Sequence, residues 1–158
     1  YMAVYKILDD FYEPTFSVIA IHSYLEDYRL AYLLNLHLQS KLKRLPVNID
    51  FKDKTSFSVY EWEDEYQHTV WNLISNKFHT ESDVIEIKGE NLFSLNNTTM
   101  THFLIPERNR IDYFLKIDNG TTVPDLKKIV AKINMIGQVS TAYHLNIESL
   151  KSRNNLIF

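Results

Sequence analysis

Cysteine is absent from this chain of 158 residues, and glycine and proline are scarce, with three and four copies. Without a thiol the chain has no disulfide, no thiolate metal ligand and no cysteine nucleophile. With so little glycine it also lacks the patterns of the loops that cradle nucleotide phosphates. These absences exclude thiol chemistry and disfavour the common nucleotide-binding folds.

A strong net charge and long apolar runs are missing too. The formal net charge is −3 and no basic run is longer than Lys43-Arg44, so the chain offers little to neutralise phosphates. No stretch approaches the ~20 apolar residues that span a bilayer, and the N-terminal stretch lacks the basic start of a signal peptide. We therefore expect a cytoplasmic protein without membrane contact, and nucleic-acid binding is disfavoured.

What is present is typical of a globular protein. Hydrophobic residues make up 45% of the chain, charged residues 23% and aromatic residues 13%. A chain of this length and composition can bury one substantial core. The sequence therefore predicts a single domain over residues 1–158.

Several β-branched and aromatic stretches predict strands in the first half of the chain. The string TFSVIAI predicts a strand over 15–21, and a strand at 3–8 precedes it. Two aromatic runs, 56–62 and 68–75, are joined by the acidic link 63–65. That arrangement predicts a hairpin with a charged tip.

Leucines at three- and four-residue spacings predict a helix over about 24–43. Ser23 and Glu26 have the spacing of a capping box at its start. Pro46 is expected to end the helix, because proline resists helical continuation.

The polar segment between residues 80 and 100 carries weaker signals. Val84, Ile85 and Ile87 predict a short strand, and the run of Asn and Thr at 96–99 predicts a loop.

The last third has the clearest pattern. Apolar residues alternate over 111–117, a turn is expected at 118–120, and a helical stripe over 126–136 closes at Gly137. A second alternating segment at 139–145 completes a β-α-β unit, of which residues 15–62 form a looser copy. The sequence thus predicts an α+β fold with an antiparallel or mixed sheet, two main helices on one face, ferredoxin-like units and an added aromatic hairpin.

One short motif stands out, HFLIPERNRIDYFLKID at 102–118. Its pattern I-P-E-x-x-x-I-D-Y comprises Ile105, Pro106, Glu107, Ile111, Asp112 and Tyr113. The motif resembles the signature of the bacterial IPExxxVDY family, with Ile111 where the family name has Val. The resemblance extends to SYLEDYRLAYLLN at 23–35, YEWEDE at 60–65 and the ending LKSRNNLIF. It implies a Bacteroidetes-type bacterial protein and no established activity.

The motif has two readings. In the structural one, Pro106 ends a strand and residues 106–110 form a hairpin loop. Glu107 and Asp112 are then solvated or bond loop amides, Arg108 and Arg110 are surface charges, and Ile111 and Tyr113 pack inward. In the functional one, Glu107 and Asp112 converge as a carboxylate pair for acid–base work or for a cation.

Other candidate sites are weaker. The candidate partner surface is the acidic, aromatic hairpin tip, which could grip a basic partner and comprises Glu61, Trp62, Glu63, Asp64 and Glu65. The six histidines have no recognised ligand spacing, so no metal site is expected, and nothing indicates a cofactor. No serine is framed as a nucleophile, and Ser23 is interpreted as a helix cap.

These observations favour a non-enzymatic binding or regulatory module that acts through protein contacts or self-association. The terminal β-α-β unit resembles half of the ACT and AsnC-type effector domains, which join sheets, and this implies a homodimer. A small-molecule ligand is compatible with that reading. The first alternative is a small enzyme using Glu107 and Asp112, and the second is an RNA-binding protein.

The chain ends with three large apolar residues at 156–158. Such side chains are rarely left in water, so we expect this tail to dock into its own domain or across a dimer interface.

Overall fold

The computed structural model describes residues 16–85, 95–118 and 125–158. The strands are β1 (Phe16–Ser23), β2 (Lys43–Arg44), β3 (Ile49–Asp50), β4 (Ser56–Phe57), β5 (Val59–Asp64), β6 (Thr69–Ser75), β7 (Lys77–Ile85), β8 (Leu95–Phe103), β9 (Tyr113–Asp118) and β10 (Val139–Leu145). The helices are α2 (Asp27–Leu38) and α3 (Leu126–Asn134), with short 3₁₀ helices η1 (Pro106–Arg108), η2 (Ile147–Ser149) and η3 (Arg153–Leu156). The strand predicted at 3–8 and most of the turn predicted at 118–120 lie outside the described residues.

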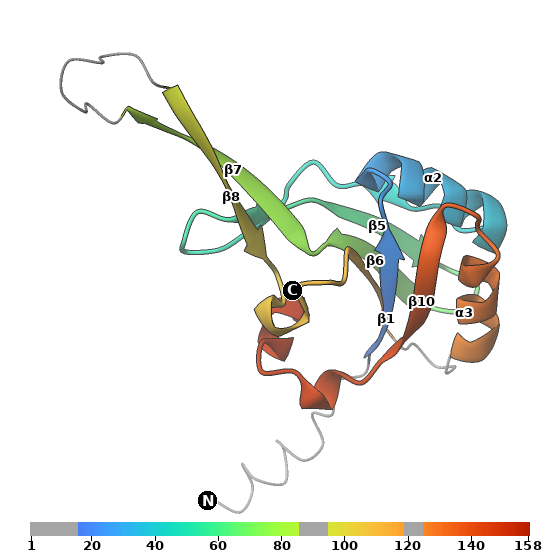
Figure 1. Cartoon of the computed structure of the whole chain (residues 1–158). Coiled ribbons are helices and arrows are strands. Elements are labelled where there is room, and N and C mark those ends of the chain that lie inside the picture. The colour runs from blue at the N-terminus through green and yellow to red at the C-terminus, as the bar shows by residue number, and fades with distance from the viewer. Residues whose placement is uncertain (1–15, 86–94, 119–124) are drawn as a thin grey trace, which may run out of the picture.

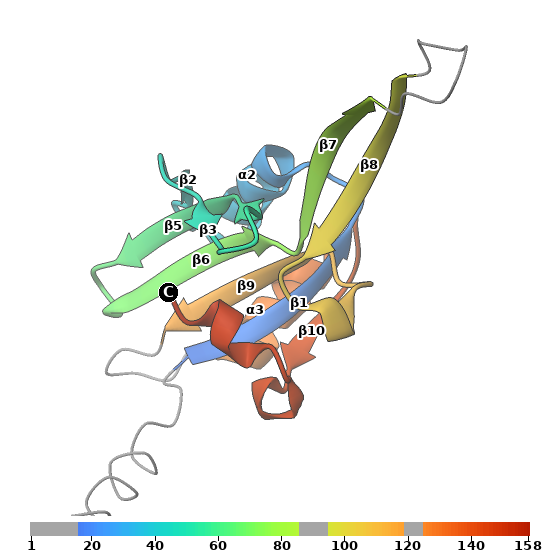
Figure 2. The same ribbon diagram turned by 90° about the vertical axis from the view of Figure 1, so that its left-hand side faces the viewer.

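Six strands form one antiparallel sheet in the order β10-β1-β9-β6-β5-β2. Helices α2 and α3 cover one face of this sheet (Figure 1), and the C-terminal 3₁₀ helices lie on the other face (Figure 2). The predicted α+β class, with two main helices on one face, is confirmed. The hairpin of aromatic strands is confirmed as β5 and β6, which are part of the sheet.

The division into two β-α-β units needs one correction. The second unit consists of β9, α3 and β10, with β1 inserted between its strands. The first unit does not end at 56–62, because β5 runs antiparallel to β1 and it is β6 that runs parallel to it. The ferredoxin-like detail stays a prediction.

The sheet is buried on both faces and therefore has two apolar cores. The first core, under α2 and α3, includes Ile19, Leu30, Leu34, Leu73, Leu115 and Ile133. The second core, under the C-terminal segment, includes Val18, Phe57, Ile74, Ile105, Phe114 and Leu156. The alternation in β9 predicted one buried face, but the structure buries both, since the C-terminal segment covers the other side.

One charged residue, Lys116 of β9, lies on the second of these faces. It is only 3% exposed, and its Nζ lies 4.7 Å from the centre of the Phe16 ring and 4.2 Å from that of Phe158. Its carboxylate neighbour is Asp118, at 3.9 Å. Burial lowers the pKa of Lys116, and Asp118 offsets part of this effect.

The C-terminal tail docks in part. Leu156 is fully buried in the second core, whereas Ile157 is exposed and Phe158 is half exposed beside Lys116. The prediction of docking into the same domain is thus confirmed for Leu156.

Helix α2 is shorter than the predicted 24–43. Gln39 takes a left-handed conformation with φ 55° and ends the helix at Leu38. The Asn35 side chain then holds Leu42, accepting from its N–H at 2.9 Å and donating to its C=O at 3.1 Å. These contacts, and not Pro46, set the end of the helix.

The predicted capping box is wrong. Glu26 is the N-cap residue of α2, and its side chain makes no capping hydrogen bond. Ser23 is buried, and its hydroxyl donates to the Gln138 carbonyl at 2.9 Å and accepts from the Leu25 N–H at 3.2 Å. Ser23 therefore ties the end of β1 to the turn between α3 and β10.

Strands β7 and β8 pair along their whole length and form a ribbon that extends from the body (Figure 1). The loop predicted at 96–99 lies inside β8, so that prediction is wrong. Cross-strand pairing overrides the weak local preference of Asn and Thr. The strand predicted at 84–87 belongs to β7 as far as Ile85, and its remainder lies outside the described residues.

Candidate functional site

The motif loop, residues 104–112, is held by one buried side chain, Asn76. Its Oδ1 accepts from the Ile105 N–H at 2.8 Å, and its Nδ2 donates to the carbonyls of Arg108 at 3.0 Å and Ile111 at 2.8 Å. Pro106 begins η1 within this loop. The hairpin-loop prediction is wrong, because β8 pairs with β7 while β9 pairs with β1 and β6.

Glu107 attaches the C-terminal segment to the motif loop. Its carboxylate accepts from the Ser152 N–H at 2.7 Å and from the Ser152 hydroxyl at 2.9 Å. Desolvation by neighbouring atoms alone would raise the pKa of Glu107, but the hydrogen bonds from Ser152 and from nearby backbone lower it overall. Glu107 therefore acts as an ionised anchor.

Asp112 and Tyr113 attach the motif to the end of β1 and the start of α2. The Asp112 carboxylate accepts from the Ser23 N–H at 2.9 Å and pairs with the Lys77 ammonium at 2.8 Å. The Tyr113 hydroxyl donates to the carbonyl of Leu25. Burial, together with the charge of nearby Asp27, raises the pKa of Tyr113, so this phenol stays protonated.

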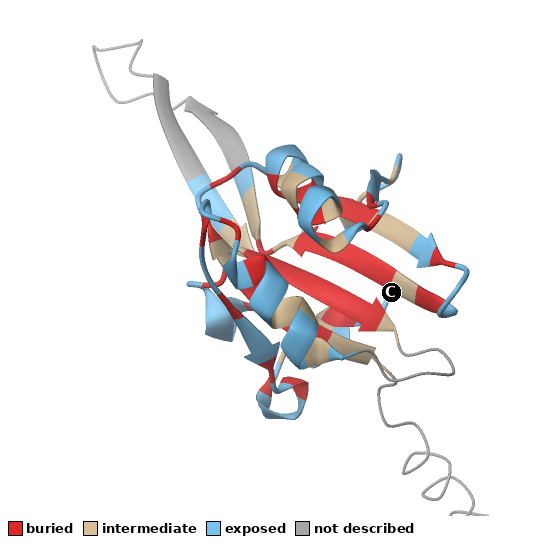
Figure 3. Cartoon of the chain, turned by 90° about the vertical axis from the view of Figure 1, so that its right-hand side faces the viewer, coloured by how far each residue is buried: buried red, intermediate tan, exposed pale blue. Residues whose placement is uncertain are grey.

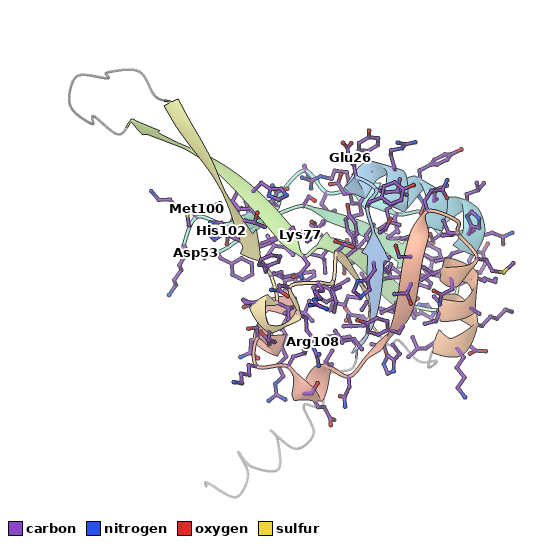
Figure 4. The ribbon with its side chains drawn as sticks, viewed as in Figure 1. Glu26, Asp53, Lys77, Met100, His102 and Arg108 are labelled. Carbon is purple, nitrogen blue, oxygen red and sulfur yellow. The ribbon has the colours of Figure 1, made fainter. Side chains whose placement is uncertain are left out.

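Glu107 and Asp112 thus bond to different segments and do not form the predicted pair in any hydrogen bond of the described residues. A hollow of about 420 Å³ beside Asp112 is lined also by Lys77 and Tyr113, and Glu107 is not among its lining residues. Figure 4 shows Lys77 at the foot of the ribbon. The contacts of the two carboxylates are structural.

The acidic hairpin tip is a rigid turn beside a larger hollow. Asp64 is buried, and its Oδ1 accepts from the N–H groups of Tyr66 at 3.0 Å and Gln67 at 3.4 Å. Trp62 contacts Trp71 across the strands, with ring centres 5.3 Å apart. The hollow, of about 560 Å³, is lined by Gln39, Lys41, Lys43, Glu61, Trp62, Glu63, Asp64, Glu65 and Tyr66. All five residues predicted as a partner surface therefore line one concave surface.

A second surface was not predicted. Tyr28, Tyr32 and Leu36 lie on the outer side of α2 at four-residue spacing, and Tyr24 precedes them by four residues. Their exposed fractions are 57%, 66%, 63% and 82% in that order. We call these four residues the tyrosine face. Figure 3 shows this side of α2 exposed, opposite the buried side that contains Leu30 and Leu34.

The tyrosine face borders a shallow groove. The groove has a volume of about 530 Å³ and is lined by Leu25, Tyr28, Arg29, Tyr32, Leu33 and Gln138. The carboxylate of Glu26, at the start of α2 (Figure 4), hydrogen-bonds to Tyr28 and raises its pKa. The four-residue spacing of these residues is present in the sequence, where it overlaps the leucine stripe of the same helix.

No group of three or more His, Asp or Glu side chains suited to a metal occurs within 16–85, 95–118 and 125–158. In the same ranges no helix is long and apolar enough to cross a membrane.

Comparisons with family models, with curated proteins and with solved structures find no match to this chain. The resemblance to the IPExxxVDY family, which the motif indicates, therefore stays a prediction.

Proposed function

We propose that the protein is a non-enzymatic binding module that acts through protein contacts and self-associates through the tyrosine face. The observation that carries this proposal is a group of four large side chains, each more than half exposed, of which Tyr28, Tyr32 and Leu36 lie along α2 and Tyr24 lies just before it. Contiguous apolar patches on a surface mark interaction sites more often than scattered apolar residues do. Tyrosine is among the residues enriched in protein interfaces.

The face is compatible with a second copy of itself. In an antiparallel arrangement of two α2 helices, a two-fold axis between Tyr28 and Tyr32 pairs Tyr28 with Tyr32 of the second copy. The same arrangement brings Leu36 toward the segment before the partner helix, which contains Tyr24. Residues four apart form a ridge, and such ridges interdigitate in the commonest class of helix packing. Arg29 lies between the two central tyrosines of the opposite copy, where it can stack on a ring.

The two alternatives receive less support. An enzyme that uses Glu107 and Asp112 needs them to converge, whereas each bonds to its own structural partner. RNA binding needs a basic surface, whereas the tyrosine face has Glu26 and Asp27 next to Arg29. A cytoplasmic location is part of the proposal and is supported by the absence of cysteine.

Light scattering over a range of protein concentrations tests the proposal. We expect the wild type to reach the mass of a dimer, and the double variant Tyr28→Ser/Tyr32→Ser to remain a monomer with an unchanged fold. Val47→Ser is the matched control, because Val47 is 69% exposed and lies outside the tyrosine face, in the loop between β2 and β3. A wild type that stays monomeric at every concentration would refute self-association.

Because the chain contains no cysteine, the geometry can be tested by disulfide trapping. Tyr24→Cys and Leu36→Cys are made as separate variants, so that both central tyrosines remain. The antiparallel arrangement predicts that a mixture of the two forms crosslinks under mild oxidation and that each alone does so poorly. Equal crosslinking in all three samples would contradict this arrangement.

A further inference from the structure

The edges of the main sheet differ in how they are closed. At the β10 edge, Asn134 of α3 covers the strand: its Oδ1 accepts from the Ala142 N–H at 2.8 Å and its Nδ2 donates to the Ala142 C=O at 2.9 Å. An edge strand with free N–H and C=O groups is a template for another chain. The centre of β10 is therefore blocked, which disfavours the joining of sheets at this edge.

The opposite edge is covered over only part of its length. In β2, Lys43 and Arg44 pair with Glu61 and Tyr60 of β5. The chain before Lys43 leaves the sheet, because Asn35 binds both backbone groups of Leu42. Among the described residues, no strand therefore lies beside residues 62–64 of β5 on this edge.

One residue of that stretch presents its backbone to the open edge. The Leu45 N–H donates to the Val59 C=O at 3.0 Å, so Val59 turns its backbone groups toward β2. Backbone groups alternate in direction along a strand, so Glu61 and Glu63 turn theirs the same way. Those of Glu61 meet Lys43, whereas Glu63 lies beyond the end of β2 and faces the hollow of about 560 Å³.

We propose that this hollow binds an extended, basic peptide segment, which adds a strand to β5 beside Glu63. Strand β2 already provides an example of this pairing, since Lys43 lies directly opposite Glu61 of β5. A segment that continues the line of β2 places a Lys or Arg opposite Glu63 on the same face of the sheet. Its neighbouring side chains point to the other face, toward Trp62.

A second copy of this chain fits the edge poorly. Antiparallel pairing of two β5 edges about Glu63 would set two glutamates directly opposite each other, and like charges in that position are destabilising. The turn of the hairpin that bears the site is already held by Asp64, so the hairpin loses little conformational freedom when a segment binds. The inference concerns a surface separate from the tyrosine face and does not depend on it.

The test uses a short synthetic peptide that alternates valine and lysine, followed by amide NMR and hydrogen exchange. We expect the exposed Glu63 amide to exchange at least about tenfold more slowly in the complex, because it becomes hydrogen-bonded. A peptide that alternates valine and glutamate, and a valine–lysine peptide with a central proline, should bind weakly. A peptide that is attracted only by charge, without pairing to β5, would shift NMR resonances but would not slow the hydrogen exchange of the Glu63 amide.

Glu63→Lys is the decisive variant, and Glu148→Lys, at an exposed position of η2, is its matched control for the change in net charge. We expect the first to weaken peptide binding roughly fivefold to tenfold at low salt and the second to leave it nearly unchanged. Equal weakening by both, or no protection of the Glu63 amide, would overturn the proposal. Repeating the titration in Tyr28→Ser/Tyr32→Ser separates this result from self-association.

Discussion

Replacement of Asn76 by alanine tests whether the motif loop is a structural junction. The Asn76 side chain is fully buried and makes three hydrogen bonds, all to backbone atoms of the loop. Alanine leaves the Ile105 N–H and the Arg108 and Ile111 carbonyls without this partner. The two backbone hydrogen bonds of residue 76, to the Asp112 carbonyl and from the Leu104 N–H, would remain, so the ends of the loop stay attached while its interior loses its support.

The expected loss of stability follows from these three groups. A buried polar group left without a partner costs about 1–3 kcal/mol. The bonds to Ile105 and Ile111 are buried, and the one to Arg108 is partly buried. We therefore expect Asn76→Ala to lower the free energy of unfolding by about 3–5 kcal/mol, a large share of the ~5–15 kcal/mol of a typical domain.

Chemical denaturation followed by circular dichroism measures this loss. Asn155→Ala is the control, because its amide makes a single, partly buried bond to the Leu104 carbonyl at 2.8 Å, and we expect a loss of about 1 kcal/mol. Similar small losses for both variants would refute the central role of Asn76.

Asn76→Asp tests the loss of the hydrogen-bond donor separately from the loss of side-chain volume that alanine also causes. It keeps the shape and the acceptor for Ile105, but it turns a carboxylate oxygen toward the carbonyls of Arg108 and Ile111. Burial and these carbonyls raise the pKa of the new carboxyl group, so its deficit against wild type should shrink as the pH falls and the group is protonated. A deficit that does not depend on pH would contradict the donor argument.

Three further changes probe other contacts. Lys116→Met should raise the free energy of unfolding by about 1–3 kcal/mol at neutral pH, since it removes a buried charge. The folded protein lowers the pKa of Lys116 below its ordinary value of 10.5, so wild type gains stability as the pH rises toward that value. In urea denaturation, the stability advantage of Lys116→Met over wild type should therefore shrink as the pH rises. An advantage that grows with pH would contradict this explanation. Glu107→Gln weakens the acceptor for Ser152, so limited proteolysis should cut the C-terminal segment sooner than in wild type, and an unchanged cleavage rate would show that this anchor is dispensable. Asn134→Ala frees the Ala142 edge, so light scattering should detect new self-association at high concentration, and its absence would mean that the edge is protected in another way.

The parts of the fold that were predicted correctly are those with a regular apolar period. The strands β1, β5, β6, β9 and β10 and helix α3 lie where the sequence predicted them. The buried positions differ in two strands: β9 buries both faces, and β10 buries Val139, Ala142 and Leu145 in place of alternate residues. The end of α2 was misplaced because it depends on tertiary contacts of the Asn35 side chain with Leu42. No local pattern reports such a contact.

In the candidate site, too, features formed by adjacent residues could be predicted, and contacts between distant residues could not. The hairpin surface was predicted from adjacent residues, and the structure places all five around one hollow. The paired carboxylates could not be judged from sequence, because their partners Ser152 and Lys77 lie 45 and 35 residues away. Asn76, which organises the motif, lies outside it and carries no signal of its own in the sequence.

Several residues of the motif have structural contacts. Ile105 and Ile111 fill the second core, Glu107 anchors the C-terminal segment, and Asp112 joins β1 to Lys77. These bonds meet at the point where the β7–β8 ribbon leaves the sheet, since Asn76 lies between β6 and β7. The same junction that orders the loop therefore sets where the ribbon begins, and the two candidate binding surfaces, on α2 and at β5, lie on other elements and remain accessible.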